Sequence, residues 1–208
     1  MKTREELIDE LLDLAFAEDI GDGDHTTLCC IPADEMGKSH LLVKEEGILA
    51  GVEIARMVFE RFDKDLKMTV FINDGAHVKP GDIAFEVEGR VRSLLQTERL
   101  MLNIMQRMSG IATVTHKYME ELKGLKTKVL DTRKTTPGMR MLEKEAVKIG
   151  GGTNHRIGLF DMILLKDNHV DFAGGIANAI NNAHEYLKRN NKDLKIEIEV
   201  RNLDELQQ

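Results

Sequence analysis

The chain has 208 residues, of which 42% are hydrophobic and 31% are charged, and its formal net charge is -7. This length and composition are typical of a globular protein with a sizeable core, built as one large domain or two small ones. The acidic balance argues against a nucleic-acid partner, which needs a broad basic surface, and no apolar run approaches the ~18 residues of a membrane-spanning helix.

The first predicted element is a helix over Thr3–Glu18. Thr3 and Glu6 have the spacing of a capping box. Its apolar face is expected to contain four residues: Leu7, Leu11, Leu14 and Ala15. The glycine-rich stretch at 20–24 predicts a turn after this helix.

Two adjacent cysteines, Cys29 and Cys30, follow this turn. Neighbouring residues cannot join distant strands through a disulfide, and the pair lacks the spacing of a metal site. Because reduced thiols are typical of the cytoplasm, and because the N-terminus does not resemble a signal peptide, we expect a cytoplasmic location.

Short strands and one helix fill the chain up to about residue 90. The helix is predicted over Val52–Phe62, and turns are predicted at 73–75 and 79–82, where Asn-Asp-Gly and Lys-Pro-Gly-Asp occur. Three strands are predicted: His40–Val43, Met68–Ile72 and Ile83–Val87. This mixture indicates an α+β domain over residues 1–110.

A longer helical region is predicted over Ser93–Met108, and a second helix is predicted over Ala112–Leu122. The first of these carries apolar residues at helical spacing, three of which are methionines. Methionine suits either a ligand surface or a core, and core packing is the favoured interpretation. Arg99 and Arg107 lie on the same helix, and spacing alone does not show which of them points into a site.

Strands alternate with helices from residue 111 to 208. Three strands are predicted: Thr127–Asp131, Met162–Leu165 and Lys195–Val200. The helices predicted around them are Met139–Lys148, Ile176–Arg189 and one that starts near Asn202. This alternation predicts parallel βα units, in a barrel or in a doubly wound sheet. Three units cannot close an eight-stranded barrel, so the alternatives are an open sheet and a chain that stops partway through a barrel.

Charged residues collect at the carboxyl ends of these predicted strands. Asp131–Lys134, Lys166 and Glu199 belong to three different strand ends. Because ligands of parallel α/β folds bind at this edge, the three positions predict one binding rim. Five cations indicate a small ligand with several negative charges: Arg133, Lys134, Arg140, Arg156 and Lys166. The alternative is that these are ordinary solvated surface charges.

Three motifs in this region resemble one enzyme family. They are Asp-Thr-Arg-Lys-Thr-Thr-Pro-Gly at 131–138, Gly-Gly-Gly-Thr-Asn-His-Arg at 150–156 and Leu-Leu-Lys-Asp-Asn-His at 164–169. Together with similar stretches at 17–24, 98–99 and 109–113, they strongly resemble the quinolinate phosphoribosyltransferase family. The resemblance implies an α/β protein, with an α+β N-terminal sandwich domain over 1–110 and an open, here incomplete, (β/α) barrel over 111–208.

The resemblance also implies an activity. Family enzymes transfer a phosphoribosyl group from 5-phosphoribosyl-1-pyrophosphate to quinolinate and release pyrophosphate and CO2. The product is nicotinate mononucleotide, on the de novo route to NAD. Mg²⁺ accompanies phosphoribosyl pyrophosphate as a cofactor. The implied assembly is a homodimer, or a higher oligomer built from it, in which the N-terminal domain of one subunit covers the barrel mouth of the other.

Eight site residues follow from matching the family's motifs to this sequence. Quinolinate carboxylate contacts are implied for Arg99, Arg133, His155 and Arg156, with Arg99 donated across the dimer. The catalytic residues implied at the reacting centre are Lys134, Lys166 and Glu199, of which Glu199 lies near the ribose and the magnesium-bound pyrophosphate. Thr132 matches a neighbouring substrate contact. No residue of this chain is expected to form a protein metal site.

Several interpretations remain open beside this one. Gly150–Gly152 suits a phosphate cradle or the C-terminal cap of a helix, and His155 suits a ligand contact or an ordinary buried histidine. Family members continue beyond the position of Gln208 with a second acidic residue and Ser/Gly-rich phosphate loops, so the activity of these 208 residues alone stays open. The alternatives are a truncated, non-catalytic homologue that binds an aromatic dicarboxylate and a related pyridine phosphoribosyltransferase.

Overall fold

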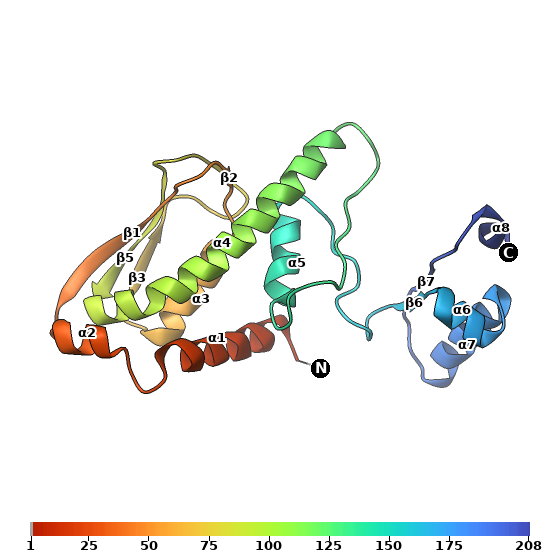
Figure 1. The fold of residues 1–208 in the computed structure, drawn as a ribbon, viewed down its shortest axis with the longest axis horizontal. Helices are drawn as coiled ribbons and strands as arrows, with labels where there is room; N and C mark the ends of the chain where they lie inside the picture. Colours follow the sequence, from red (N-terminus) through yellow and green to blue (C-terminus); the bar gives the residue numbers. More distant parts are fainter. Residues whose placement is uncertain (1) are drawn as a thin grey trace. The chain divides into compact units, whose positions relative to one another are not determined.

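The computed structural model describes residues 2–208 and contains two compact units, whose boundary along the chain falls between Asn154 and His155. Figure 1 shows the helices and strands of each unit, coloured along the chain. Residue 110, where the two predicted domains meet, lies inside a continuous helix, α4 (Val91–Glu121). The division into domains at residue 110 therefore stays a prediction, and the two compact units are described separately below.

Helix α1 (Arg4–Ile20) begins at the predicted capping box. The amide of Glu6 donates to Thr3 Oγ1 at 3.2 Å, and the amide of Thr3 donates to Glu6 Oε2 at 2.8 Å. The predicted apolar face was wrong in part: Leu11 packs against the core, but the buried residues are Ile8 and Leu12, and Leu14 is 66% exposed. Both stripes have helical spacing, so spacing alone does not distinguish them.

A pair of acidic residues lies beside the buried stripe. Asp9 and Asp13 follow Ile8 and Leu12 by one position and form ion pairs with Arg61 of α3 (Val52–Phe62), at 3.0 and 2.6 Å. These contacts hold this side of α1 toward the body of the unit. The glycine-rich stretch after α1 contains the expected turn, but a short helix, α2 (His25–Cys30), follows at once, because Asp24 caps it by accepting from the Thr27 amide at 3.0 Å.

The sheet of the first unit has three antiparallel strands in the order β1-β5-β3. These strands are β1 (Met36–Leu42), β3 (Lys67–Val70) and β5 (Ile83–Arg90), and each overlaps a predicted strand. A second pair, β2 (Gly47–Ile48) with β4 (His77–Val78), is short and was not predicted. Helix α3 has the bounds that the sequence predicted.

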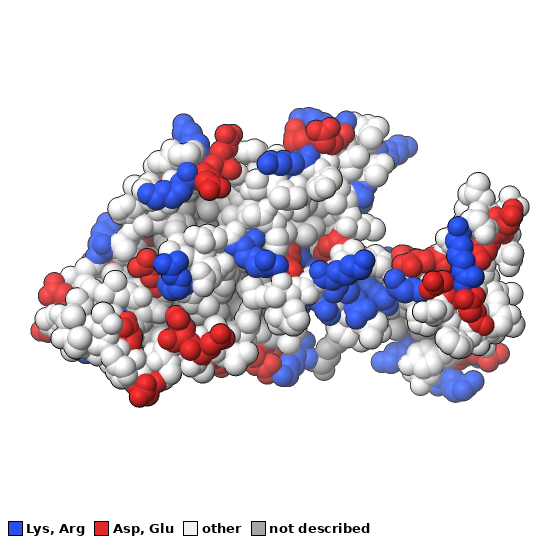
Figure 2. Space-filling model, viewed as in Figure 1, with Lys and Arg blue, Asp and Glu red and all other residues white. Residues whose placement is uncertain are grey.

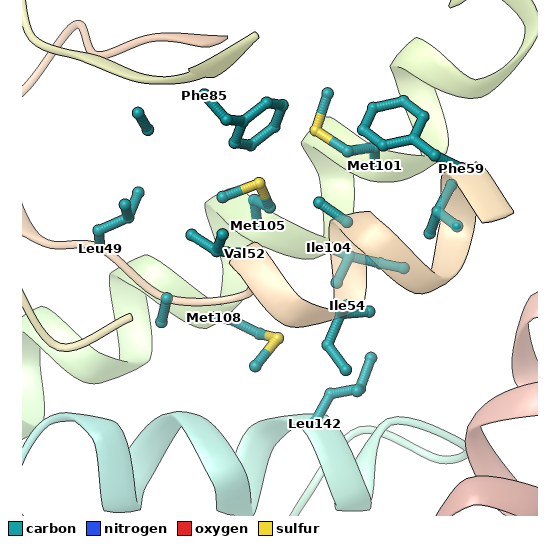
Figure 3. Close-up of a cluster of buried hydrophobic side chains, with 14 of the residues drawn as sticks. Leu49, Val52, Ile54, Phe59, Phe85, Met101, Ile104, Met105, Met108 and Leu142 are labelled. Carbon is teal, nitrogen blue, oxygen red and sulfur yellow. The ribbon is translucent and has the colours of Figure 1, made fainter. Parts of the chain in front are cut away.

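The core of the first unit lies between β5, α3 and α4. Figure 3 shows Phe85 of β5 and Ile54 of α3 facing a row of methionines from α4. Met101, Met105 and Met108 are at most 6% exposed, so the core-packing interpretation of these methionines is confirmed. Burial of such side chains contributes about 1.5–3 kcal/mol each and fixes α4 against the sheet.

Helix α4 is a single helix of 31 residues, and the prediction of two separate helices was wrong. Gly110 weakens a helix by only about 1 kcal/mol, so it does not break one that is well packed. The residues around it are held by tertiary contacts: Met108 and Ala112 are fully buried, and Ser109 Oγ accepts from the Ala50 amide at 3.0 Å. Packing therefore outweighs the local preference for a break.

The predicted strand at Thr127–Asp131 is absent. Its backbone makes one parallel bridge, between Leu130 and Thr153, with hydrogen bonds of 2.8 and 3.2 Å on either side. The chain around Thr153 is irregular. Residues 127–131 therefore have no extended segment beside them with which to form a longer β-ladder. Helix α5 (Arg140–Ile149) follows and packs against α4.

The second unit contains one parallel strand pair, β6 (Ile163–Leu165) with β7 (Ile196–Ile198). The connection between the two strands carries α6 (Asp167–Ala173) and α7 (Ile176–Arg189), and a short α8 (Leu203–Gln207) ends the chain. Val170, Ile176 and Ala179 form a small core beneath these helices. The α/β class is confirmed, and residues 2–208 form no closed barrel.

Candidate functional site

Residues 131–136, hereafter the 131–136 segment, carry three of the predicted site residues in the first unit. The segment is irregular and lies against the first turns of α5. Arg140 Nε donates to Thr135 Oγ1 at 3.1 Å, and the amide of Thr136 donates to Glu143 Oε2 at 3.2 Å. Within the segment, the amide of Lys134 donates to Thr132 Oγ1 at 3.1 Å. The segment is thus held by side chains rather than by a β-ladder.

Arg133 is the predicted site residue that has a buried nitrogen without a hydrogen bond among the described residues. The side chain is half-buried, and its Nε is a buried nitrogen that has no hydrogen-bond partner among residues 2–208. A buried, unpartnered guanidinium nitrogen costs free energy, and a bound carboxylate would remove that cost. Thr132 and Lys134 are exposed on either side of it.

Asp131 begins the segment with a buried ion pair. Its carboxylate accepts from Nζ of Lys144 on α5, and the two side chains are 7% and 2% exposed. When the Asn154 amide is oriented with its nitrogen toward these groups, it donates to Asp131 Oδ2 and to the Lys144 carbonyl, both at 2.8 Å. The Asp131–Lys144 ion pair was not predicted from the sequence, because thirteen positions separate the two residues and nothing in their spacing indicates a contact.

Arg107 and Glu143 support the other end of the segment. Arg107 Nε donates to Glu143 Oε1 at 2.7 Å, and Arg107 Nη2 donates to Thr136 Oγ1 at 2.7 Å. Burial raises the pKa of Glu143, but hydrogen bonds from Arg107 and Thr136 outweigh it, so that this pKa lies below its usual value. Arg107 thus contacts both the 131–136 segment and the α5 residue that supports it.

Arg99 lies exposed on α4 in the same unit. In the part of the chain that the structure describes, no hydrogen bond or ion pair joins it to the 131–136 segment. A groove of about 640 Å³ between β2 and α4 contains none of the eight predicted residues. Within the described part of its own unit, Arg99 is therefore not brought together with Arg133, the other predicted quinolinate contact there.

The second unit contains the remaining four predicted residues, which lie on and beside the β6–β7 pair. Lys166 Nζ donates to both oxygens of Glu199, at 3.0 and 3.3 Å. Arg156 is 8% exposed, and its Nη1 donates to the Met162 carbonyl at 3.4 Å. The structure thus brings Lys166 and Glu199 into direct contact, as expected for two neighbouring strand ends.

His155 pairs with a residue that the predicted site did not include. The imidazole Nε2 of His155 lies 2.9 Å from Glu197 Oε2, and the His155 side chain is 15% exposed. Glu197 lies on β7 and Glu199 directly follows it, and their alternation with Ile198 is that of side chains on one face of a strand; both are exposed. That same alternation was the signal that could have added Glu197 to the predicted residues.

The glycines at 150–152 form a helix end. Gly150 follows the last residue of α5, and a Cβ on it would meet the Ala112 carbonyl oxygen of α4 at 2.4 Å. Gly151 has a φ of 93°, which favours glycine. The C-cap interpretation is therefore the correct one. His169 likewise has a structural role, because its Nδ1 accepts from the Lys166 amide at 2.9 Å at the start of α6.

The carboxylates of the chain do not form a complete metal site. Among residues 2–208, no three His, Cys, Asp or Glu side chains converge as metal ligands. Mg²⁺ is often held by one or two carboxylates together with substrate phosphates. Glu199 fits that limited role, since it is exposed at a strand end beside Lys166.

The chain spans about half the length of the first curated relatives that it matches. No helix between residues 2 and 208 has the length and apolar character of a membrane span. On the face drawn in Figure 2, acidic and basic side chains of the first unit are interspersed. These features describe the surface of the chain, and comparison with known proteins identifies its family.

Both parts of the chain match models of one family. The quinolinate phosphoribosyl transferase N-terminal domain matches residues 24–109, and the corresponding C-terminal domain matches residues 111–208. Quinolinate phosphoribosyltransferase (decarboxylating) 1b of Nicotiana tabacum is 47% identical over 197 residues, which are 94% of this chain and 56% of that relative.

Two solved structures agree with this match. NadC from Streptococcus pyogenes is 41% identical with a TM-score of 0.89, and the match covers 95% of this chain and 69% of that one. The nicotinate-nucleotide pyrophosphorylase from Francisella tularensis is 42% identical with a TM-score of 0.88, covering 100% and 71%. Sequence and fold thus agree along both units, and the chain belongs to the quinolinate phosphoribosyl transferase family.

Proposed function

We propose that this chain acts in phosphoribosyl transfer from 5-phosphoribosyl-1-pyrophosphate to quinolinate, with decarboxylation to nicotinate mononucleotide in the de novo synthesis of NAD. The enzyme class is a pentosyltransferase. The observation that carries the proposal is the buried, unpartnered Nε of Arg133, which lies in a motif shared with the family. An acceptor supplied by a substrate would satisfy this nitrogen.

The predicted quinolinate contacts suit a ligand with two adjacent carboxylates. Arg133 and Arg156 each present a planar fork that can bind a carboxylate in two places. His155 adds an imidazole ring, whose Nε2 lies 2.9 Å from Glu197 Oε2. A monocarboxylate such as nicotinate would satisfy fewer of these donors than quinolinate.

The Lys166–Glu199 pair suits the transfer step. Attack by the ring nitrogen on the ribose carbon develops positive charge on the sugar, which the carboxylate of Glu199 would stabilise. Lys166 and Lys134 would offset the negative charge of the leaving group and of the carboxylate that is lost. Glu199 would help to hold the Mg²⁺ that accompanies phosphoribosyl pyrophosphate, and this ion would supply charge neutralisation for the departing pyrophosphate.

The proposal extends to assembly and location. We propose a homodimer in which Arg99 acts in the site of the partner subunit. Its exposure on α4, without a local ion pair among the described residues, supports this role. The thiols of Cys29 and Cys30 are free and exposed, which suits the reducing cytoplasm.

Turnover by the chain tests this proposal. We expect release of pyrophosphate and CO2 in equal amounts when quinolinate, phosphoribosyl pyrophosphate and Mg²⁺ are supplied together, and no release when any one is omitted. The control is Lys134→Ala, which removes a lysine of the reacting centre and should abolish release while leaving the fold intact. Quinolinate binding without any release would instead favour the dicarboxylate-binding alternative.

A further inference from the structure

The polar face of α5 contacts the 131–136 segment at several points. Arg140, Glu143 and Lys144 are spaced three and four positions apart, so they lie on one side of the helix. Arg140 donates to Thr135 Oγ1 and, at 3.4 Å, to the Arg133 carbonyl; Glu143 accepts from the Thr136 amide. Lys144 completes the set through its ion pair with Asp131.

The Lys144–Asp131 pair is the most buried of these contacts. Lys144 is 1% exposed, so a ligand in solvent cannot reach its ammonium group. Removing two charges from water is costly, and apolar residues of similar size are often equally stable at such positions. The pair is therefore a poor source of stability, but it fixes the orientation of the Asp131 carboxylate.

The Asp131 carboxylate in turn joins two segments of the chain. One oxygen accepts from Lys144, and the other accepts from the Asn154 amide nitrogen at 2.8 Å. Asp131 directly precedes Thr132 and Arg133, and Asn154 directly precedes His155 and Arg156. A single buried carboxylate thus anchors the starting points of both segments that carry predicted quinolinate contacts.

We infer that Lys144 is a positioning residue, which orders the 131–136 segment for binding through its ion pair with Asp131. This inference rests on the proposed function for its link to quinolinate. Lys144 does not contact the substrate in this account. Its effect is to hold Asp131, and thereby the backbone that carries Arg133, in one arrangement before a ligand arrives. A segment ordered in advance loses less entropy on binding, which raises affinity.

Two variants separate this role from a general effect on folding. Lys144→Met alone would remove the lysine ammonium from beside the buried Asp131 carboxylate and is expected to destabilise the chain strongly. The double variant Asp131→Asn/Lys144→Met removes both charges, so we expect it to regain much of the thermal midpoint. Leu142→Ala is the matched control, because Leu142 is fully buried on the same helix and its side chain packs in the hydrophobic core of the first unit.

Hydrogen exchange and calorimetry are then measured on the same samples, below all thermal midpoints. In the double variant, we expect the Thr136 amide to exchange at least about tenfold faster than in the unsubstituted chain, and quinolinate to bind at least about tenfold more weakly. In Leu142→Ala, we expect quinolinate affinity within about twofold of the unsubstituted chain, although its midpoint is lower.

The outcomes distinguish the inference from the proposed function. Unchanged exchange at Thr136 in the double variant overturns the positioning role, whether or not quinolinate binds. Faster exchange with unchanged quinolinate affinity also overturns it, because ordering would then not matter for binding. If the unsubstituted chain does not bind quinolinate, the proposed function fails, and the exchange result alone decides whether Lys144 orders the segment.

Discussion

Arg133 is the residue whose environment most directly indicates a ligand. Its Nε is buried and, among the described residues, has no partner, although its backbone carbonyl is held by Arg140. Native structures leave few buried polar groups unsatisfied, and each exception has a specific cause. Under the proposed function, this cause would be an anionic substrate bound beside Arg133.

Arg133→Ala should therefore weaken quinolinate binding by about 2–5 kcal/mol, the range for losing one partner of a buried charge pair. Isothermal titration calorimetry measures the change. Arg189→Ala is the control, because Arg189 is 78% exposed on α7 and contacts only Glu185 at 3.9 Å among the ion pairs of the described residues. Equal affinity of Arg133→Ala and Arg189→Ala would contradict the assignment.

Asp63 allows a prediction about stability and pH. Burial raises its pKa, but hydrogen bonds from Arg90 and Ser93 outweigh it, so the pKa lies below the usual value. The Asp63 side chain is 4% exposed, and Ser93 Oγ donates to it at 2.6 Å. Since the folded pKa is the lower one, this group adds stability that is complete above its unfolded pKa of about 3.9 and is lost as the pH falls through the folded value.

Asp63→Asn should thus cost about 1.5–3 kcal/mol at pH 7, and the gap to the unsubstituted chain should narrow as the pH falls to about 3. Denaturant unfolding at several pH values measures the gap. The control, Asp65→Asn, alters a neighbour that is 80% exposed and should cost less than about 1 kcal/mol. A gap for Asp63→Asn that does not change with pH would show that its carboxylate is not responsible.

Among the elements, α4 differs most from what its sequence predicts. A turn at Ser109-Gly110 would divide it, whereas the structure has one helix from Val91 to Glu121. A Cβ added at Gly110 would meet nothing within 4 Å. Gly110→Ala should therefore stabilise the chain by about 0.4–1 kcal/mol, because alanine restricts the unfolded chain and favours a helix.

Gly150→Ala is the matched comparison for this prediction. Its Cβ would meet the Ala112 carbonyl oxygen at 2.4 Å and Thr115 Cβ at 2.8 Å, where α5 ends against α4. This variant should be destabilised, by about 1–3 kcal/mol. Thermal unfolding of both variants measures the difference. A loss of stability in Gly110→Ala would instead favour two separate helices.

The sequence predicted some elements well, for physical reasons that are local. Helices α3 and α7 have the predicted bounds, because a strong apolar period and glycine or asparagine at their ends mark them. The strand at Thr127–Asp131 failed because pairing depends on a partner, and its partner at Thr153 offers a single bridge. Helices α2 and α6 were missed because they are short and depend on caps at Asp24 and Lys166.

The residues of the candidate site could be predicted from the sequence where they belong to motifs. Seven of the eight predicted residues belong to the quoted motifs, and the eighth, Glu199, lies at a predicted strand end. The Lys166–Glu199 contact follows from two neighbouring strand ends. The supporting residues Arg107, Glu143 and Lys144 were not predicted, because each acts through a contact between distant positions of the chain. Such contacts depend on how α4 and α5 pack, which the sequence pattern does not report.

At the scale of the whole molecule, the proposed dimer leads to a prediction that concerns two subunits together. If Arg99 acts in the partner's site, Arg99→Ala and Arg133→Ala each disable both sites of a homodimer. Mixing the two variants under conditions of subunit exchange should then restore about a quarter of the activity, since half of the dimers are mixed and each has one intact site. Pyrophosphate release measures the recovery, and its absence in a mixture that does exchange subunits would place Arg99 outside the partner's site.

The most direct test of the central claim compares two ligands that differ by one carboxylate. Calorimetric titration of the chain with quinolinate and with nicotinate should give at least about tenfold tighter binding of quinolinate, because the second carboxylate engages a further charged donor. The preference should disappear in Arg133→Ala. Equal affinity for the two ligands in the unsubstituted chain, or no binding of quinolinate, would contradict the quinolinate contacts proposed for Arg133, His155 and Arg156.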